Sequence, residues 1–303
     1  EHTIAIAENG TLWGWGKNNL YQLGLGFYVY ATQTLPVQIG TANNWQSIAT
    51  HDNSTMAITT EGTLWAWGQG TLGMGSNSSI GFPTQLGTDS DWKSVSVSAE
   101  HCLAIKTTGT LWSWGSGGNG ALGLGSELNN TLKSAPTQVG SATHWKAIAA
   151  SKGFSIALTT SGTLWSWGSS QDGRLGIGNT SSQYVPVQVG TDTDWQSITT
   201  GEEYALAIKT TGTLWAWGAN SYGQLGLGNT SGTNIPVQVG SATHWQNVSA
   251  GLFHTLAITT DGTLWSWGYN NYGELGLGDN VNRNVPVQVG LQNNWQSIDA
   301  RVF

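Results

Sequence analysis

Two adjacent positions recur seven and eight residues after a repeated Trp, and their residue types suit protein recognition. The pairs are Asp52 and Asn53, Ala99 and Glu100, Lys152 and Gly153, Glu202 and Glu203, Leu252 and Phe253, and Val302 and Phe303. Apolar residues beside acids are typical of protein interfaces, where an aromatic side chain often supplies the anchor. We therefore predict partner contacts, anchored by Phe253 or Phe303, at Asp52, Asn53, Glu100, Lys152, Glu202, Glu203, Leu252, Phe253 and Phe303. The alternative is ordinary variation among solvated loops.

Four tyrosines suggest a second kind of site. Tyr28, Tyr30, Tyr222 and Tyr272 lie between strand-like segments, where their rings could stack on sugars. Small sites repeated along the chain would then add avidity. A glycan-binding, lectin-like module is therefore the alternative to a protein-binding scaffold, and a structural module of a larger surface protein is a third reading.

Residues capable of catalysis or metal binding do not form a recognisable set. Asp192-Thr-Asp194 lacks the further oxygen ligands of a calcium loop, and Cys102 is the sole cysteine. His101 and His254 occupy equivalent places in two repeats, which favours a structural hydrogen bond. We predict no enzyme activity, no cofactor and no metal.

A glycine-rich segment, Asn220 to Gly228, resembles a phosphate-binding loop only superficially. It lacks the Lys-Ser/Thr ending and the following helix, and related segments recur in each repeat. The segment is therefore predicted to be a structural bend.

The heptapeptide Gly-Thr-Leu-Trp-x-Trp-Gly organises the whole chain. It begins at Gly10, Gly62, Gly109, Gly162, Gly212 and Gly262. Its alternation predicts a strand with two Trp on one face and Leu with a small residue on the other, so that neighbouring sheets can interlock. All 18 Trp fit this register, three per repeat, which favours structure over photochemistry.

Each repeat of about 50 residues contains four strand-like segments, the last led by Pro as an edge strand would be. We predict an all-β fold, a β-propeller of six four-stranded blades forming one domain over residues 1–303. The chain starts and ends in mid-repeat. The N-terminal strands are therefore predicted to close the ring by pairing into the last blade.

Composition limits the partners. The formal charge is −7, the ten basic residues are scattered, and no segment has the length or apolarity of a membrane span. We predict neither nucleic-acid binding nor membrane insertion. Few lysines, one cysteine and abundant Ser, Thr and Asn favour an extracellular or cell-surface protein, which we expect to be monomeric.

Three recurring signatures together resemble the RCC1 (regulator of chromosome condensation 1) repeat family. They are Ser-Ala-Gly-x-x-His-Thr-Leu-Ala-Ile at residues 249–258, the strand ending in Trp-Gly, and Asn-x-x-Gly-Gln-Leu-Gly-x-Gly. The resemblance implies a propeller whose Gly-x-x-His loops ring one face and carry partner contacts. The best-known members have seven blades, so six is a departure.

Functions in this family diverge, and the residues of this chain suit some of them better than others. They include nucleotide exchange on a small GTPase with chromatin binding, ultraviolet sensing through Trp, and β-lactamase inhibition by a secreted bacterial member. This chain lacks basic surfaces and has no Trp in the Gly-x-x-His loops. It looks most similar to secreted bacterial members, whose common theme is protein binding.

Overall fold

A computed structural model describes residues 2–26, 31–75, 79–126 and 131–300 of the chain. In these ranges 23 strands form six antiparallel sheets, as the fourfold pattern of the repeats predicts. The chain divides into two compact units, Glu1–Gly153 and Phe154–Phe303, and each is described by itself. That both belong to a single domain stays a prediction.

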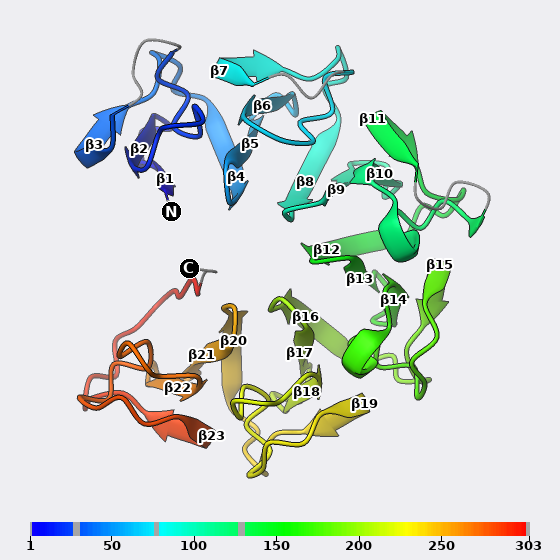
Figure 1. The fold of residues 1–303 in the computed structure, drawn as a ribbon, viewed down its shortest axis with the longest axis vertical. Helices are drawn as coiled ribbons and strands as arrows, with labels where there is room; N and C mark the ends of the chain where they lie inside the picture. The colour runs from blue at the N-terminus through cyan, green and yellow to red at the C-terminus, as the bar shows by residue number, and fades with distance from the viewer. Residues whose placement is uncertain (1, 27–30, 76–78, 127–130, 301–303) are drawn as a thin grey trace. The chain divides into compact units, whose positions relative to one another are not determined.

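Unit 1 contains one three-stranded sheet, two four-stranded sheets and the first strand of the fourth blade (Figure 1). The strands are β1 (His2–Ile6), β2 (Leu12–Gly16), β3 (Gln33–Gln38), β4 (Trp45–His51), β5 (Ser54–Thr59), β6 (Leu64–Gly68), β7 (Ile80–Gln85), β8 (Trp92–Val97), β9 (His101–Lys106), β10 (Leu111–Ser116), β11 (Leu132–Gln138) and β12 (Trp145–Ser151). A short 3-10 helix, η1 (Gly118–Gly120), lies in a loop.

Unit 2 continues the fourth blade and contains two further four-stranded sheets. Its strands are β13 (Phe154–Thr159), β14 (Leu164–Gly168), β15 (Gln183–Gln188), β16 (Trp195–Thr200), β17 (Tyr204–Lys209), β18 (Leu214–Gly218), β19 (Thr233–Gln238), β20 (Trp245–Ala250), β21 (His254–Thr259), β22 (Leu264–Gly268) and β23 (Arg283–Gln288). The 3-10 helix η3 (Gln171–Gly173) follows β14. The predicted ring closure concerns how the two ends of the chain meet, and it stays a prediction.

The heptapeptide forms the third strand of each four-stranded sheet, and its two faces pack as the alternation predicts. In β18 the small Ala216 is fully buried, and one core cluster joins it and Leu225 to Trp267 of the next blade. The bulky indole of one sheet therefore lies on the shallow face of its neighbour. Equivalent clusters join Leu12 to Trp67 and Ala66 to Trp114 in unit 1.

The glycine-rich loop locks adjacent blades together. The carbonyl oxygen of Gln224 accepts hydrogen bonds from Trp267 Nε1 and Thr255 Oγ1, each at 2.9 Å. A Cβ on Gly226 would lie 2.9 Å from Trp267 Nε1, so the indole needs a glycine there. The backbone N–H of Gly228 donates to the Asn284 carbonyl in β23 at 2.8 Å. The recurring glycines thus have a structural role in this loop.

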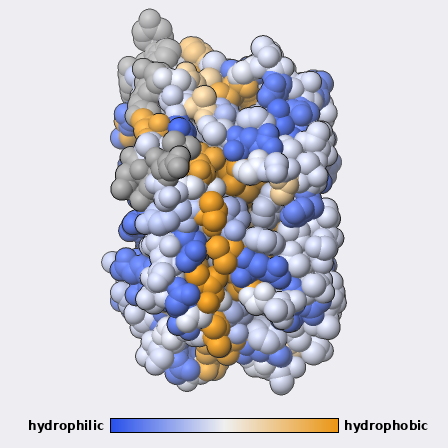
Figure 2. All heavy atoms as spheres, turned by 90° about the vertical axis from the view of Figure 1, so that its right-hand side faces the viewer, coloured by the Kyte–Doolittle hydropathy of each residue, from blue (hydrophilic) through white to orange (hydrophobic). Residues whose placement is uncertain are grey.

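The Pro-led strand lies at an edge of each sheet, as predicted. A large apolar residue precedes Pro in five of these strands and is exposed: Leu35, Phe82, Val185, Ile235 and Val285. Figure 2 shows apolar surface as a narrow strip on the mostly polar face that it draws. A Cβ built on Gly228 of the preceding loop would lie 3.9 Å from Val285, which indicates that this side chain packs against that loop.

Candidate functional site

The predicted contact positions occupy equivalent turns between the first and second strands of the blades. Asp52 and Asn53 connect β4 to β5, Glu100 precedes β9, and Lys152 follows β12. In unit 1, Asp52 is exposed at a φ of 44°, with its Oδ1 3.5 Å from His51 Nδ1. In unit 2, Glu202 and Glu203 precede β17, and Leu252 and Phe253 precede β21. Phe303, Tyr28 and Tyr30 lie outside the described residues.

A backbone hydrogen bond ties each of these turns in unit 2 to the loop that follows the heptapeptide. Ala219 N–H donates to the Glu203 carbonyl at 3.0 Å, and Tyr269 N–H donates to the Phe253 carbonyl at 2.9 Å. The second residue of the turn is therefore held beside the residue that follows Trp-Gly.

An aromatic cluster in unit 2 joins Phe253 to two of the predicted tyrosines. Ring centroids lie 5.0 Å apart for Tyr222 and Phe253, 5.0 Å for Tyr222 and Tyr269, and 6.3 Å for Tyr269 and Tyr272. Tyr222 comes from the fifth blade and the others from the sixth. Tyr272 is 87% exposed and Tyr222 36%. We call Tyr222, Phe253, Tyr269 and Tyr272 the aromatic cluster. It brings together a residue predicted to bind protein, Phe253, and two tyrosines predicted to bind glycans.

An open surface pocket, called the cavity below, has a volume of about 650 Å³ and reaches Ser221, the residue before Tyr222 of the aromatic cluster. Its lining residues are Asp172, Gly173, Thr180, Glu203, Ala219, Asn220, Ser221, Gly232, Thr233 and Asn234. The short segment from Ala219 to Ser221 forms one wall, and the next residue is Tyr222. The cavity and the cluster therefore share one loop.

A buried arginine holds the two carboxylates of the cavity. The Arg174 guanidinium lies 3.2 Å from Asp172 and 3.5 Å from Glu203, and its Nε donates to the Gln171 carbonyl at 2.8 Å. Only 4% of the Arg174 side chain is exposed, against 44% for Asp172 and 32% for Glu203. The two acids thus present a net negative charge to solvent beside the buried cation.

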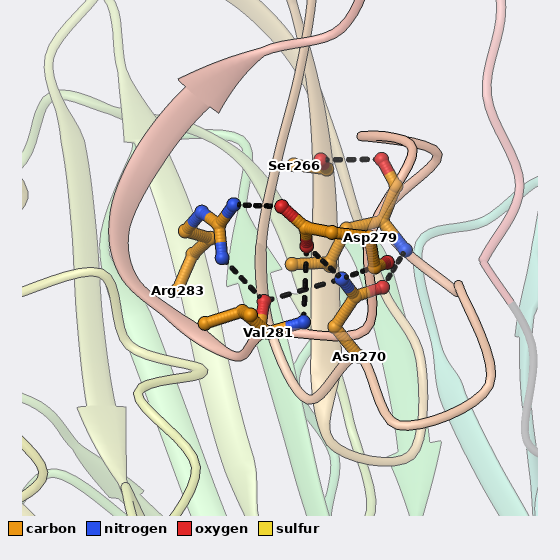
Figure 3. Close-up of polar contacts among 6 residues, drawn as sticks. Ser266, Asn270, Asp279, Val281 and Arg283 are labelled. Carbon is orange, nitrogen blue, oxygen red and sulfur yellow. Dashed lines mark hydrogen bonds and ion pairs between the residues drawn. The ribbon is translucent and has the colours of Figure 1, made fainter.

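Buried asparagines shape the loops that present the tyrosines. In the sixth blade, Asn270 Oδ1 accepts from Leu275 N–H at 2.9 Å, and its Nδ2 donates to the carbonyls of Asp279 and Val281 at 2.9 and 3.1 Å (Figure 3). Arg283 donates to the Asp279 carboxylate at 2.6 Å, and hydrogen bonding to Val281 and Arg283 lowers the pKa of Asp279. Asn220 makes the corresponding bonds beneath Tyr222, to Leu225, Asn229 and Ser231.

We expect Asn270→Ala to lower the free energy of unfolding by about 2 kcal/mol, because it leaves the buried N–H of Leu275 without its acceptor and removes the hydrogen bonds to the carbonyls of Asp279 and Val281. The matched control is Asn271→Ala, which alters an exposed neighbour and should cost less than about 0.5 kcal/mol. Urea unfolding followed by Trp fluorescence measures both. Equal losses would show that Asn270 does not organise the loop.

Asp192-Thr-Asp194 faces a lysine from its own blade. Lys209 Nζ lies 2.7 Å from Asp192 and 3.0 Å from Asp194, and 4.8 and 4.9 Å from the ring centroids of Trp195 and Trp215. Lys106 repeats the arrangement with Asp89 and Asp91. The carboxylates of each Asp-x-Asp segment are thus paired with a lysine ammonium group. This ion pair gives the two aspartates a structural role that needs no calcium ion.

Lys209→Thr, which copies Thr259 of the sixth blade, should destabilise the protein by about 1 kcal/mol through loss of the ion pair and cation–π contacts. Burial lowers the pKa of Lys209, but the hydrogen bonds that Lys209 donates to Asp192 and Asp194 outweigh it, and the net pKa is raised. The stabilisation is therefore complete below the unfolded pKa of lysine and is lost as pH rises through the folded value.

The matched control for Lys209→Thr adds Asp192→Ala and Asp194→His, which reproduces Ala242 and His244 of the sixth blade. Thermal unfolding at pH 7 should show that the triple variant regains part of the loss. A triple variant less stable than Lys209→Thr alone would contradict the pairing.

The two candidate histidines are buried. His101 Nδ1 lies 3.1 Å from Ser98 Oγ, and burial lowers the pKa of His101 to about 4, with His51 adding to the effect. Burial also lowers the pKa of His254, although Glu274 opposes it. Within the described ranges, no group of three or more His, Cys, Asp or Glu could hold a metal ion.

The pattern of matches decides the family. The model described as "Regulator of chromosome condensation (RCC1) repeat" matches residues 9–58, 61–105, 108–158, 161–208, 211–258 and 261–300. The chain belongs to the RCC1 repeat family. The six matches correspond to the six heptapeptide copies.

Curated relatives are longer proteins. The Arabidopsis thaliana RCC1 domain-containing protein RUG3, mitochondrial, is 33% identical over 177 residues, which cover 58% of this chain and 28% of RUG3. A Caenorhabditis elegans homologue of the X-linked retinitis pigmentosa GTPase regulator is 33% identical over 72 residues, covering 24% of the chain and 5% of that protein. The chain therefore spans a minor part of each.

Solved structures share the fold. Prp20p from Saccharomyces cerevisiae has a TM-score of 0.82 at 23% identity, covering 96% of this chain and 75% of Prp20p. Human WBSCR16 has a TM-score of 0.87 at 20% identity, covering 99% and 83%. The fold of this RCC1-repeat chain is accordingly an all-β, six-bladed β-propeller with four-stranded antiparallel blades. None of the described helices is long and apolar enough to cross a bilayer.

Sequence reasoning missed Tyr269, Asp172 and Arg174 as parts of the site. A signal for Tyr269 was present, because the residue after Trp-Gly differs in most repeats: Lys17, Gln69, Ser116, Ser169, Ala219 and Tyr269. A residue that changes from repeat to repeat directly after a recurring strand is typical of a surface position, where the fold does not dictate the residue type.

Proposed function

We propose that this chain is a non-enzymatic scaffold that binds a protein partner through the turns between the first and second strands and the neighbouring loops. The observation that carries the proposal is the aromatic cluster, in which Phe253 and three tyrosines contact one another and Tyr272 is 87% exposed. Clustered aromatic side chains with an exposed edge are typical of the anchors of protein interfaces.

The family supports protein binding as the class of function. RCC1-type propellers are proteins of interaction and regulation, and the structural reports describe binding of Prp20p to Gsp1p and histones, and Kap60 bound to yeast RCC1. Those partners belong to those proteins. The formal charge of −7 in this chain favours a partner other than nucleic acid.

The proposed setting is outside the cell or at its surface. Support comes from composition: only ten Lys and Arg, a single Cys that is buried, and many Ser, Thr and Asn. Fractionation of the source cells tests it; recovery in the medium or on protease-accessible surfaces supports the proposal, and recovery only inside intact cells overturns it.

Capture experiments test the binding proposal itself. The immobilised wild-type protein, Phe253→Ala and the control Phe82→Ala, which removes an exposed Phe from an edge strand, are exposed to the same extract. We expect a protein retained by wild type and control and reduced at least about tenfold on Phe253→Ala, the loss typical of an interface anchor. Equal retention by all three would contradict the proposal.

Glycan binding is the second candidate, favoured by the exposure of Tyr222 and Tyr272 in one cluster. Titration with a glycan panel separates the two. A lectin should show weak single-site affinity, in the millimolar range, and tighter binding of multivalent glycans. Tyr272→Ala should abolish that binding, whereas a protein-binding site should respond to none of the sugars.

A further inference from the structure

We infer that the cavity and the aromatic cluster together bind one extended peptide segment of the partner, which places a Lys or Arg side chain in the cavity and an aromatic or large apolar side chain on the cluster. This inference rests on the proposed function and specifies the chemistry of its partner.

The charge of the cavity selects a basic side chain. Asp172 and Glu203 line it, both with substantial exposure, while Arg174 between them is almost fully buried. One guanidinium against two carboxylates leaves a net negative charge facing the opening. The other polar lining residues include Thr180, Ser221 and Thr233, whose hydroxyl groups can accept hydrogen bonds from an ammonium or guanidinium group. An anionic ligand would meet repulsion at the same place.

Contacts on several sides hold the Arg174 side chain and backbone in place. Its Nε donates a hydrogen bond to the Gln171 carbonyl, and its Cζ lies over the Phe154 ring, 5.8 Å from the ring centroid. The backbone carbonyl of Arg174 accepts from Trp217 Nε1 at 3.0 Å, which anchors the residue in the interface between blades. The arginine therefore acts as a fixed support that positions the two carboxylates.

The shared loop sets the spacing of the two contacts. Ser221 lines the cavity, and the next residue, Tyr222, lies 5.0 Å from Phe253 by ring centroids. Adjacent Cα atoms are about 3.8 Å apart and an extended chain advances about 3.3 Å per residue. One extended segment can thus pass from the cavity to the cluster along this loop, and the peptide series below measures how many residues separate its basic and apolar side chains.

The test uses blocked peptides of defined composition. Each contains one Arg and one Phe separated by zero, one or two Gly, and analogues replace Arg by Gln or Phe by Ala. Affinities are measured by calorimetry with the wild-type protein, Glu203→Gln, Asp172→Asn and Tyr222→Ala. The control is Glu8→Gln, which removes an exposed carboxylate from unit 1. Thermal unfolding of each variant verifies that it is folded.

We expect at least one Arg–Phe peptide to bind about tenfold more tightly than both of its analogues. Glu203→Gln and Asp172→Asn should each remove most of the preference for Arg over Gln, and added salt should weaken binding. Tyr222→Ala should remove the preference for Phe over Ala, and Glu8→Gln should match wild type.

Three results would overturn the inference: no peptide binding up to millimolar concentration, equal binding of the Arg and Gln peptides, or equal affinities in wild type and Glu203→Gln. If a captured protein still depends on Phe253 in any of these cases, protein binding stands and only the peptide chemistry is wrong. If the capture also fails to depend on Phe253, the proposed function falls as well.

Discussion

Trp267→Ala should lower the free energy of unfolding by about 4 kcal/mol, the largest effect expected for a single substitution in this chain. The indole is fully buried, packs on Ala216 and Leu225 of the preceding blade, and donates a hydrogen bond to the Gln224 carbonyl at 2.9 Å. Its removal leaves a cavity at the interface between two sheets that no neighbouring side chain fills.

Two further variants separate packing from polarity at Trp267. Trp267→Phe keeps much of the ring and loses the N–H donor, so we expect a loss of about 1–2 kcal/mol. Trp295→Ala truncates an indole that is 42% exposed and should cost less than about 2 kcal/mol. Guanidinium unfolding measures all three, and a Trp267→Ala protein as stable as Trp295→Ala would contradict the interlocking of blades.

Gly212→Ala should cost about 3 kcal/mol, the second largest effect. Gly212 has a φ of 75°, and a Cβ there would lie 2.2 Å from the Thr243 carbonyl oxygen of the next blade. The Gly212 carbonyl also accepts from Trp245 N–H at 3.0 Å. The substitution combines left-handed backbone strain of about 1–2 kcal/mol with displacement of the adjoining blade.

The matched control for Gly212→Ala is Gly240→Ala. Gly240 has a φ of 59°, and a Cβ there would have nothing within 4 Å. It should show only the backbone cost, about 1 kcal/mol. The difference in unfolding free energy between the two variants measures the close approach of the blades. If Gly212→Ala and Gly240→Ala lower the free energy of unfolding equally, Gly212 is needed only for the conformation of its own hairpin turn.

The fold could be predicted from the sequence because its determinants lie close together in the chain. Alternation in Leu214-Trp-Ala-Trp217 places Leu214 and Ala216 on one face of a strand, and the structure packs that face against the next blade's Trp. Proline before the last alternating run likewise predicts an edge strand. These are local signals, and period two fixes which face each residue occupies.

The candidate site was predicted only in part because it depends on how neighbouring blades are staggered. Phe253 and Tyr222 are 31 residues apart in different repeats, and no periodicity reveals that their rings meet. Arg174 between Asp172 and Glu203 is hidden for the same reason. The pairing of Lys209 with Asp192 did leave a signal, since Lys occurs at this strand position only in the two blades that carry Asp-x-Asp before Trp.

Hydroxyl-radical footprinting of the captured complex tests most directly the claim that the aromatic cluster is the partner-binding surface. The free protein should be labelled strongly at Tyr272, which is 87% exposed, and less at Tyr222. In the complex we expect labelling of Tyr272, Tyr222 and Phe253 to fall together, while exposed Phe82 keeps its labelling. A partner that leaves all three cluster residues as reactive as in the free protein would contradict the account.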